Sequence, residues 1–461
     1  MKLLDILSES RRFGIQPGLG AVRGTCAALG NPQDRVRAIH VAGTNGKGAV
    51  CAILDACIRA AGLRAGRYTS PHLVRLNERF FLDGEPMPDS VLDRAASLIP
   101  IRQLDRYSLG DGGSPFPVPP SPFPTPLTYF ELLTVVAFLV YAEAKPDYVV
   151  LETGLGGRLD ATNVCSPALT VITRIGLDHC DWLGDTVEKI AAEKAGIIKP
   201  GVPIVLGRNV PEVVDIVKSR AREVGAPFVY APDVADESEI PADYSLPGAF
   251  NRENAVTALA ALKLLFPNPR SPFPVPRSPL PVPRSPLPGF SRVVWPGRFQ
   301  RVGDIVVDGA HNPPAARALA AALGEQGVPE KSLTLVAGFC GDKDVCETLR
   351  ILSPYVCRAM AVKTNNPRSL SAEELREKME SVGIPASAAP SLSAAIESLT
   401  PVPRSPFPVP RSPIPVPHSS TPHSLICGSL FLAGEALVEL GAYPWLADRF
   451  DCSESVSAKG K

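Results

Sequence analysis

Residues 40–54, HVAGTNGKGAVCAIL, form the stretch of this sequence with the clearest chemical potential. A short apolar segment, 39–42, leads into a glycine-rich turn that carries Lys47, and a helical pattern follows. Glycines let backbone N–H groups approach phosphate oxygens, and the start of a helix adds positive potential. In the common nucleotide loop a Ser or Thr follows the Gly-Lys pair and helps to hold Mg²⁺. Here Gly48 and Ala49 follow instead. The stretch therefore predicts a phosphate-binding loop, with an ordinary glycine turn as the alternative, and leaves the metal ligands open.

Histidines and acidic residues near other glycine turns are the next candidates. Two of the six histidines, His418 and His423, lie in or beside a proline-rich tract. The other four lie in polar, glycine-bearing turns or at their edges: His40, His72, His179 and His311. Ligands of α/β proteins bind at the carboxyl ends of strands, and three of these histidines follow predicted strands. This position favours a functional role for them over a structural one. Glu152 precedes a second glycine turn, and we expect both Glu152 and His179 to end parallel strands and to converge on one ion. Mg²⁺ prefers oxygen ligands, so its chemistry alone does not nominate a histidine.

Alternating strand and helix patterns position these residues. The pattern predicts strands over 37–42, 65–69, 147–152 and 168–175, and helices over 49–61 and from Thr128. Thr128 stands three residues before Glu131, which is the spacing of a capping box. A further helix is expected to begin at Asp185 and to stop at Gly196. Continuous apolar runs indicate strands that are covered on both faces, so the pattern is that of a doubly wound α/β fold.

A second α/β set follows the segment WPGRF (295–299). Strand DIVVD leads into GAHNPP and a helix, and further strands and helices follow. The length of 461 residues suggests about two to three domains. We expect one domain over 1–290 and a second over 291–461.

Composition excludes several classes of protein. The 47 basic residues balance the 47 acidic ones, which gives no electrostatic argument for binding nucleic acid or an anionic membrane. The longest apolar run, 132–142, is shorter than the roughly 20 residues that span a bilayer. The first residues lack a secretory signal pattern. The ten cysteines contain no CxxC pair, which favours reduced, buried thiols over disulfides or zinc. We expect a cytoplasmic protein.

Three proline-rich tracts interrupt the pattern, at 115–126, 269–288 and 401–419. The last two repeat the seven-residue unit VPRSPxP, and the first is a degraded copy. Dense proline removes backbone donors, so polyproline II is the expected conformation. We interpret the tracts as inserted surface loops, with ligands for proline-reading partner domains as the alternative.

Several motifs together carry a family resemblance that covers nearly all of the chain outside these tracts. In order they are AGTNGKG, TSPHLVRLNERF, TYFE, LETGLGGRLDATN, GLDHCDWLGDTVEKIAAEKAGIIKPGVP, WPGRF, DGAHN and GSLFLAGE. The sequence resembles the folylpolyglutamate synthase/dihydrofolate synthase family of the Mur ligase superfamily. This resemblance implies a P-loop-type doubly wound ATPase domain, followed by a smaller Rossmann-like α/β domain.

The resemblance also implies a set of site residues. It places Mg²⁺ on Ser70, Glu152 and His179, so the metal does not depend on a hydroxyl at position 49. It implies a carbamylated lysine at Lys194, where a carbamate supplies anionic oxygen beside the metal. The remaining implied contacts are Asn45, Gly46, Lys47, Gly48, Asn254, Arg298 and Asp308 for ATP, and Thr128, Tyr129, Phe130, Glu131, Leu159, Asp160 and Ala161 for the pterin side of the acceptor. His311 is expected to contact phosphate as a further catalytic residue.

The implied reaction joins L-glutamate to the carboxylate of dihydropteroate or of a reduced or polyglutamylated folate. ATP phosphorylates that carboxylate, and the glutamate amine attacks the acyl phosphate. We expect a monomer that uses these small molecules, with no nucleic acid or membrane partner. Two alternatives stay open: a Mur-type ligase for another acid and amino acid, and a non-catalytic nucleotide-binding scaffold.

Overall fold

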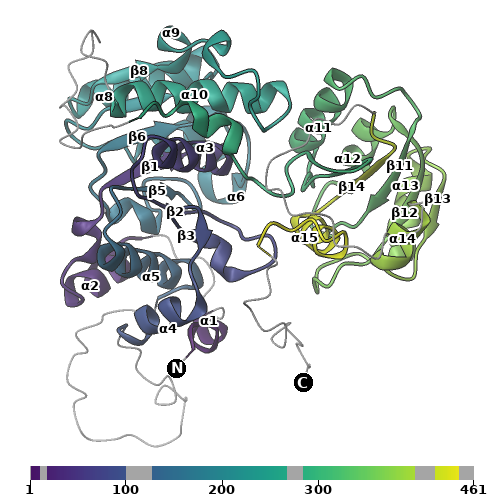
Figure 1. Cartoon of the computed structure of the whole chain (residues 1–461), viewed down its shortest axis with the longest axis horizontal. Coiled ribbons are helices and arrows are strands. Elements are labelled where there is room, and N and C mark those ends of the chain that lie inside the picture. The colour runs from purple at the N-terminus through teal and green to yellow at the C-terminus, as the bar shows by residue number, and fades with distance from the viewer. Residues whose placement is uncertain (1, 11–17, 100–126, 267–283, 400–420, 446–461) are drawn as a thin grey trace, which may run out of the picture. The chain divides into compact units, whose positions relative to one another are not determined.

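The computed structural model describes residues 2–10, 18–99, 127–266, 284–399 and 421–445. The described residues group into two compact units. Unit 1 comprises Met1–His72, Leu76–Asp243 and Arg252–Val293, and unit 2 comprises Leu73–Arg75, Tyr244–Asn251 and Val294–Lys461. Each unit is an α/β layer structure, as the sequence pattern predicts (Figure 1).

Unit 1 is built on an eight-stranded sheet with the spatial order β4-β3-β2-β5-β1-β6-β7-β8. The six strands from β2 to β8 in that order are parallel, and the β3–β4 hairpin adds to β2 in the antiparallel sense. The bounds are β1 (Ala38–Ala42), β2 (Ala65–Tyr68), β3 (Phe80–Leu82), β4 (Glu85–Pro86), β5 (Tyr148–Glu152), β6 (Leu169–Ile172), β7 (Ile204–Leu206) and β8 (Phe228–Tyr230). Every residue of β1 and β5 is buried, which confirms the interpretation of their continuous apolar runs.

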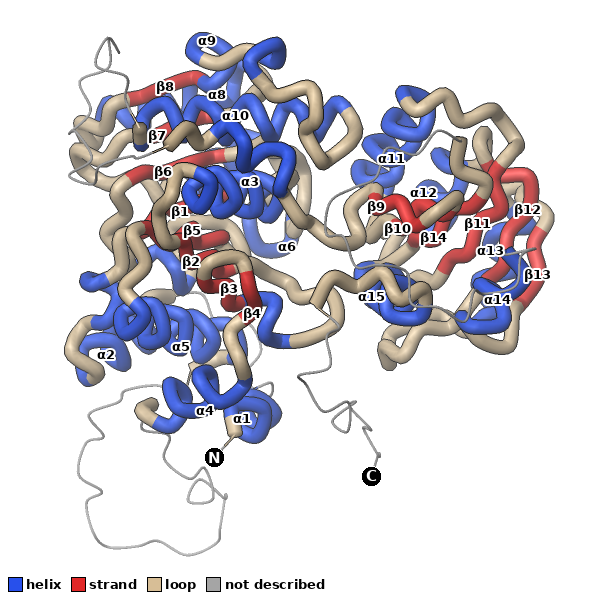
Figure 2. The backbone as a smooth tube through the Cα atoms, viewed as in Figure 1, coloured by secondary structure: helices blue, strands red, loops and turns tan. Residues whose placement is uncertain are grey.

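Helices cover both sides of this sheet (Figure 2). The α-helices of unit 1 are α1 (Leu3–Ser10), α2 (Gly20–Ala28), α3 (Lys47–Ala60), α4 (Asp89–Ser97), α5 (Tyr129–Ala144), α6 (Cys180–Leu183), α7 (Val187–Ala195), α8 (Pro211–Glu223), α9 (Ala231–Val234) and α10 (Ala249–Leu265), whose first turn belongs to unit 2. The 3₁₀ helices are η2 (Pro32–Arg35), η3 (Leu76–Arg79), η5 (Ala161–Val164), η6 (Glu237–Glu239) and η7 (Leu287–Arg292). Helix α5 packs its apolar residues against the sheet face that carries Ala38, Val149 and Leu151.

Local signals set most helix ends correctly, with one exception. The predicted capping box of α5 is confirmed: Thr128 accepts a hydrogen bond from the backbone of Glu131, and Glu131 accepts one from the backbone of Thr128. The predicted start of α7 at Asp185 is wrong by one residue, because the side chain of Thr186 caps the helix by accepting from Lys189 N. The side chain of Asp185 instead pairs with the Lys189 ammonium on the surface.

Unit 2 contains a six-stranded sheet of order β13-β12-β11-β14-β10-β9, parallel except for β9. Its strands are β9 (Gln300–Val302), β10 (Ile305–Val307), β11 (Leu333–Ala337), β12 (Val356–Ala361), β13 (Ala386–Ala388) and β14 (Ser424–Cys427). Its helices are α11 (Pro313–Glu325), α12 (Val345–Leu352), α13 (Ala372–Ser381), α14 (Leu392–Leu399) and α15 (Leu430–Glu439). Two apolar clusters form its core, one packed beneath α11, α12 and α13 and one beneath α14 and α15.

The proline-rich tracts fall mostly beyond the part of the chain that the structure describes. The polyproline II prediction for 115–126, 401–419 and the first part of 269–288 lies outside the described residues. At the end of the middle tract the prediction is wrong, because Leu287 and Pro288 begin the 3₁₀ helix η7. Gly289 lies so close to the backbone of α3 that a Cβ there would stand 2.4 Å from the Cα of Cys57. Tight packing on α3 therefore overrides the extended preference of proline at this point.

Two further sequence predictions concern the chain as a whole. Each cysteine among the described residues is a free thiol, but Cys180 and Cys357 are exposed, so the prediction of buried thiols is wrong for these two. Within the same residues, no helix combines the length and the apolar character that crossing a bilayer requires.

Candidate active site

The glycine-rich turn joins the carboxyl end of β1 to the start of α3. Gly46 caps α3 with a φ of 86°, a conformation that favours glycine. A Cβ on Gly46 would lie 2.1 Å from Oδ1 of Asn254, so only glycine lets helix α10 approach the loop this closely. The structure thus brings Asn254 of α10 against Gly46 of the loop. Ala49 lies buried in the first turn of α3.

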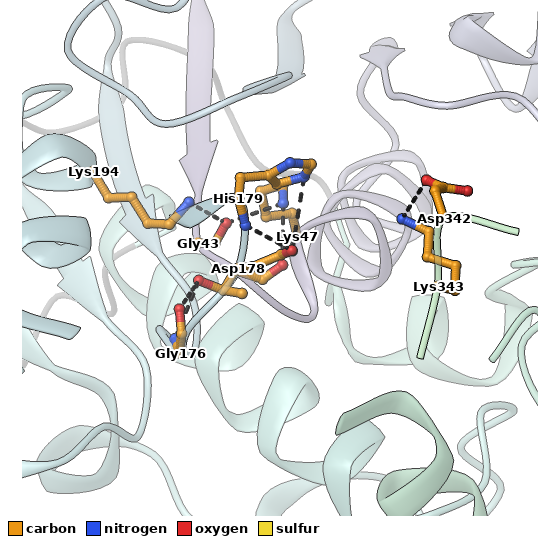
Figure 3. A network of polar contacts seen from close by, with 9 residues as sticks. Gly43, Lys47, Gly176, Asp178, His179, Lys194, Asp342 and Lys343 are labelled. Atoms are coloured by element: carbon orange, nitrogen blue, oxygen red, sulfur yellow. Dashed lines mark hydrogen bonds and ion pairs between the residues drawn. The ribbon is translucent and has the colours of Figure 1, made fainter. Parts of the chain in front are cut away.

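Two lysines converge on one carbonyl of this loop (Figure 3). Lys47 Nζ donates to the Gly43 carbonyl at 3.0 Å and to the Thr44 carbonyl at 3.2 Å. Lys194 Nζ, from the last turn of α7, donates to the same Gly43 carbonyl at 2.8 Å. Lys194 is buried, and burial, followed by the charge of Lys47, lowers the pKa of its amine to about 7. A lysine with that pKa is largely a neutral nucleophile at physiological pH.

Two of the three predicted metal ligands lie together in unit 1. Glu152 ends β5, is buried, and accepts a hydrogen bond at 3.0 Å from the backbone N–H of Ser70. A carboxylate beside a serine turn is a donor set that suits Mg²⁺. Among the described residues, no group of three or more His, Cys, Asp and Glu side chains is placed to hold a metal.

His179 does not end a strand, contrary to the sequence prediction. Strand β6 stops at Ile172, and His179 caps the short helix α6 with a φ of 50°. Its side chain is 56% exposed, and its Nε2 lies 3.9 Å from Oδ2 of Asp178. The continuous run 168–175 suggested a longer strand, but β6 ends at Ile172, and beyond it Arg174 forms an isolated bridge with Asn45 of the phosphate loop.

Four of the predicted pterin-side residues lie at the start of α5, from the N-cap Thr128 to Glu131. The guanidinium carbon of Arg79 lies over the Tyr129 ring, 5.8 Å from the ring centroid. The ring of Phe130 contacts Gly154, where a Cβ would stand 2.5 Å from the ring. Thr128 and Glu131 serve the capping box described above. Helix α5 therefore presents its first turn to the loop that follows Glu152.

That loop, residues 153–161, is organised around Asp160. The Asp160 carboxylate is buried and accepts hydrogen bonds from the backbone N–H of Leu155 at 2.8 Å and of Thr162 at 3.0 Å. Burial raises the pKa of Asp160, while these hydrogen bonds oppose the shift. Leu159 is partly exposed and Ala161 is buried. Asp160 thus holds the loop in shape, which the sequence did not reveal.

In unit 2, two of the other predicted residues, Asp308 and His311, lie in the turn after β10, and Arg298, which precedes β9, lies against that turn. The buried carboxylate of Asp308 accepts from the backbone N–H of Phe299 and of Ala310, both at 2.7 Å. Arg298 stands so close to Gly309 that a Cβ there would lie 2.4 Å from its Nη1. His311 Nδ1 lies 2.8 Å from the Gly309 carbonyl. Burial raises the pKa of Asp308, and the charge of Arg298 opposes that shift.

Sequence reasoning missed the residues that fix the phosphate loop from outside. Thr173 donates from Oγ1 to the Asn45 carbonyl at 2.7 Å. Thr44 exchanges hydrogen bonds with the backbone of Gly176, at 3.0 and 3.1 Å. A polar residue directly after the apolar run of β6 is the signal that could have identified Thr173.

Comparison with known proteins gives a consistent set of similarities. Residues 297–402 match the family model "Mur ligase, glutamate ligase domain". The chain is 34% identical over 394 residues to the dihydrofolate synthase/folylpolyglutamate synthase of Bacillus subtilis, covering 80% of this chain and 86% of that protein.

Two solved structures are similar over nearly the whole chain. One is Escherichia coli FolC in complex with DHPP and ADP, with a TM-score of 0.73 and 29% identity, covering 96% of this chain and 98% of that one. The other is the bifunctional folylpolyglutamate synthase/dihydrofolate synthase of Yersinia pestis complexed with AMPPNP and a Mn ion, with a TM-score of 0.72 and 29% identity, covering 95% and 97%.

Proposed function

This chain belongs to the folylpolyglutamate synthase/dihydrofolate synthase family, and from that premise we propose how its residues ligate glutamate in folate metabolism. The acceptor is a dihydropteroate or folate carboxylate, and ATP drives the reaction. The observation that carries the proposal is the convergence of Lys47 and Lys194 on the Gly43 carbonyl, at the carboxyl end of β1. That edge is where doubly wound sheets bind their ligands.

The reaction proceeds in two displacements. An oxygen of the acceptor carboxylate attacks the terminal phosphorus of ATP, ADP leaves, and an acyl phosphate forms. The glutamate amine then attacks the carbonyl carbon, loses a proton, and expels phosphate to leave the amide. Lys47 would turn from the loop carbonyls to the transferred phosphoryl group and offset its charge. The backbone N–H groups of 45–48 would hold the neighbouring phosphates.

Ser70, Glu152 and His179 would hold Mg²⁺. The buried carboxylate of Glu152 beside the Ser70 turn supports this assignment, and the exposed His179 would supply a third ligand. Bound there, Mg²⁺ would neutralise charge on the moving phosphoryl group. The neutral amine of Lys194 is suited to carbamylation, because CO₂ reacts only with an unprotonated amine. A carbamate at Lys194 would place an anionic group beside the metal, where the unmodified amine carries no negative charge.

The other residues would bind and orient the substrates. We assign Tyr129, Phe130 and the loop that contains Leu159, Asp160 and Ala161 to the pterin side of the acceptor, beside the capping pair Thr128 and Glu131. In unit 1, Asn254 would contact the nucleotide. For unit 2, we retain the nucleotide and phosphate contacts that the family resemblance implies for Arg298, Asp308 and His311. The monomeric state and the cytoplasmic location expected from the sequence stay predictions.

Product analysis by mass spectrometry tests the function. Purified protein is given ATP, Mg²⁺ and glutamate, with dihydropteroate and a reduced folate offered separately. We expect ATP-dependent addition of glutamate to at least one of them. Ligation only to another carboxylate would point to a different Mur-type ligase, and the lack of any ATP consumption would point to a scaffold.

A further inference from the structure

His40 is a buried polar side chain to which the reaction described above gives no role. It lies in the middle of β1 and is fully enclosed. Residues two apart on a strand share a face, so His40 faces the same side as Ala38, toward the core beneath α5. Burying an imidazole is unfavourable unless it forms hydrogen bonds. The hydrogen bonds of the His40 imidazole should therefore indicate its role.

The imidazole begins a chain of hydrogen bonds that ends on Asp160. His40 Nε2 lies 2.7 Å from Oγ1 of Thr162, and the Thr162 hydroxyl donates to Oδ1 of Asp160. A hydroxyl has a single proton, so once Thr162 donates it to the carboxylate, Nε2 must be the donor to Thr162. His40 is then the neutral Nε2–H tautomer. Burial, followed by the charge of Lys199, lowers its pKa to about 3, which agrees with that form.

These hydrogen bonds link the central strand β1 to the loop that carries pterin-side residues. The Asp160 carboxylate holds the backbone of Leu155, which lies within that loop, and of Thr162, which directly follows it. A hydroxyl polarised by His40 is a stronger donor to the carboxylate. Among the described residues, none forms a hydrogen bond with Nδ1 of His40, so the hydrogen bonding of the ring within this part of the structure goes through Nε2 to Thr162.

We infer that His40 is a positioning residue for the acceptor: it acts through Thr162 to hold Asp160 and loop 153–161 in the shape that receives the pterin. This inference rests on the proposed function of that loop. The competing explanation is a histidine that only stabilises the core. The two differ in kinetics, because a positioning role affects the KM for the acceptor selectively, whereas a stabilising role affects the amount of folded enzyme.

Matched substitutions at Thr162 provide the test. Thr162→Val keeps the side-chain shape and removes the hydroxyl, and Thr162→Ser keeps the hydroxyl. We expect Thr162→Val to raise the KM for dihydropteroate by roughly tenfold or more, as the loss of a hydrogen bond to a charged group implies. The KM for ATP should stay within about twofold, and Thr162→Ser should resemble the wild type within about threefold.

Substitutions at His40 extend the test to the first residue of the hydrogen-bond network that ends on Asp160. The amide nitrogen of Gln is as many bonds from Cβ as Nε2 of histidine, so His40→Gln should keep the hydrogen bond to Thr162 and much of the wild-type affinity for dihydropteroate. His40→Leu removes that hydrogen bond and should behave like Thr162→Val. Ile204→Val, a core substitution in β7 where no site residue is predicted, serves as the control for general destabilisation. Thermal unfolding is measured for every variant.

A measurement on the wild type keeps the inference open to refutation if a variant fails to fold. Two-bond ¹⁵N–¹H correlations should show His40 as the neutral Nε2–H tautomer at neutral pH, and an Nδ1–H tautomer or an imidazolium would overturn the chain. An unchanged KM for dihydropteroate in folded Thr162→Val would overturn the positioning role while leaving the ligase function intact. Failure of the wild type to ligate any pteroate or folate would instead overturn the proposed function.

Discussion

Removal of CO₂ is the perturbation to which Lys194 should respond most strongly. Its amine is buried in unit 1 and donates at 2.8 Å to the Gly43 carbonyl, which Lys47 also contacts. Two effects disfavour the ammonium form: burial, which is the larger, and the charge of Lys47. Both act in the free enzyme, so the amine is prepared for CO₂ before substrates bind.

The lowered pKa sets the size of the effect. A drop from 10.5 to about 7 makes about 90% of the amine neutral at pH 8, against roughly 0.3% for an ordinary lysine. The same drop corresponds to a cost of about 5 kcal/mol for the ammonium form at this position. Carbamylation forms one N–C bond and releases one proton, so protons oppose it. Carbamate occupancy should therefore fall as the pH drops through about 7.

The assay combines activity with ¹³C NMR. Enzyme dialysed into CO₂-free buffer at pH 8 should lose most of its turnover and regain it when bicarbonate is added. With ¹³C-bicarbonate, one carbamate resonance should form and should disappear in Lys194→Arg. Lys199→Arg is the matched control, because Lys199 lies in the same part of unit 1 and donates to the Asn163 carbonyl at 2.9 Å. Turnover of Lys194→Ala should recover partly with acetate or another small carboxylate.

Two results would refute this reasoning. One is full turnover in CO₂-free buffer at pH 8. The other is a carbamate resonance that survives Lys194→Arg, because the modified amine would then lie elsewhere.

Three further predictions concern other parts of the site. Lys47→Met should reduce turnover by about a hundredfold or more while thermal unfolding stays near that of the wild type, because the Lys47 ammonium donates to the Gly43 and Thr44 carbonyls of the same loop and does not bridge distant elements through these bonds. Near-normal turnover would contradict the phosphate-loop assignment. Glu152→Gln removes a buried charge from the proposed metal site, so turnover should fall by orders of magnitude, whereas Ala49→Ser should change the Mg²⁺ dependence by no more than about tenfold. A Mg²⁺ titration in which the two variants behave in the opposite way would reject the assigned ligands. Asp308→Asn leaves one of two backbone N–H groups facing an amide NH₂, so unit 2 should lose about 1.5–3 kcal/mol of stability in denaturant unfolding; an unchanged midpoint would show that these bonds contribute little.

Local sequence determined the elements and the phosphate loop. The alternation of apolar runs with helical patterns predicted the strands and helices of both units, and the spacing of Thr128 and Glu131 predicted the start of α5. A glycine turn between a buried strand and a helix was enough to nominate Lys47. These features depend on residues a few positions apart, whose φ angles, caps and periodicity act within one element.

Tertiary structure alone decided which of those residues meet. The order of the strands brings the Ser70 turn to Glu152, 82 residues away, and His40 to Thr162, 122 residues away. The same packing presses Asn254 against Gly46 and ends β6 before His179, which the sequence had placed at a strand end. No local signal encodes these contacts, because the free energy that fixes them comes from burying the sheet between helices that are distant in sequence.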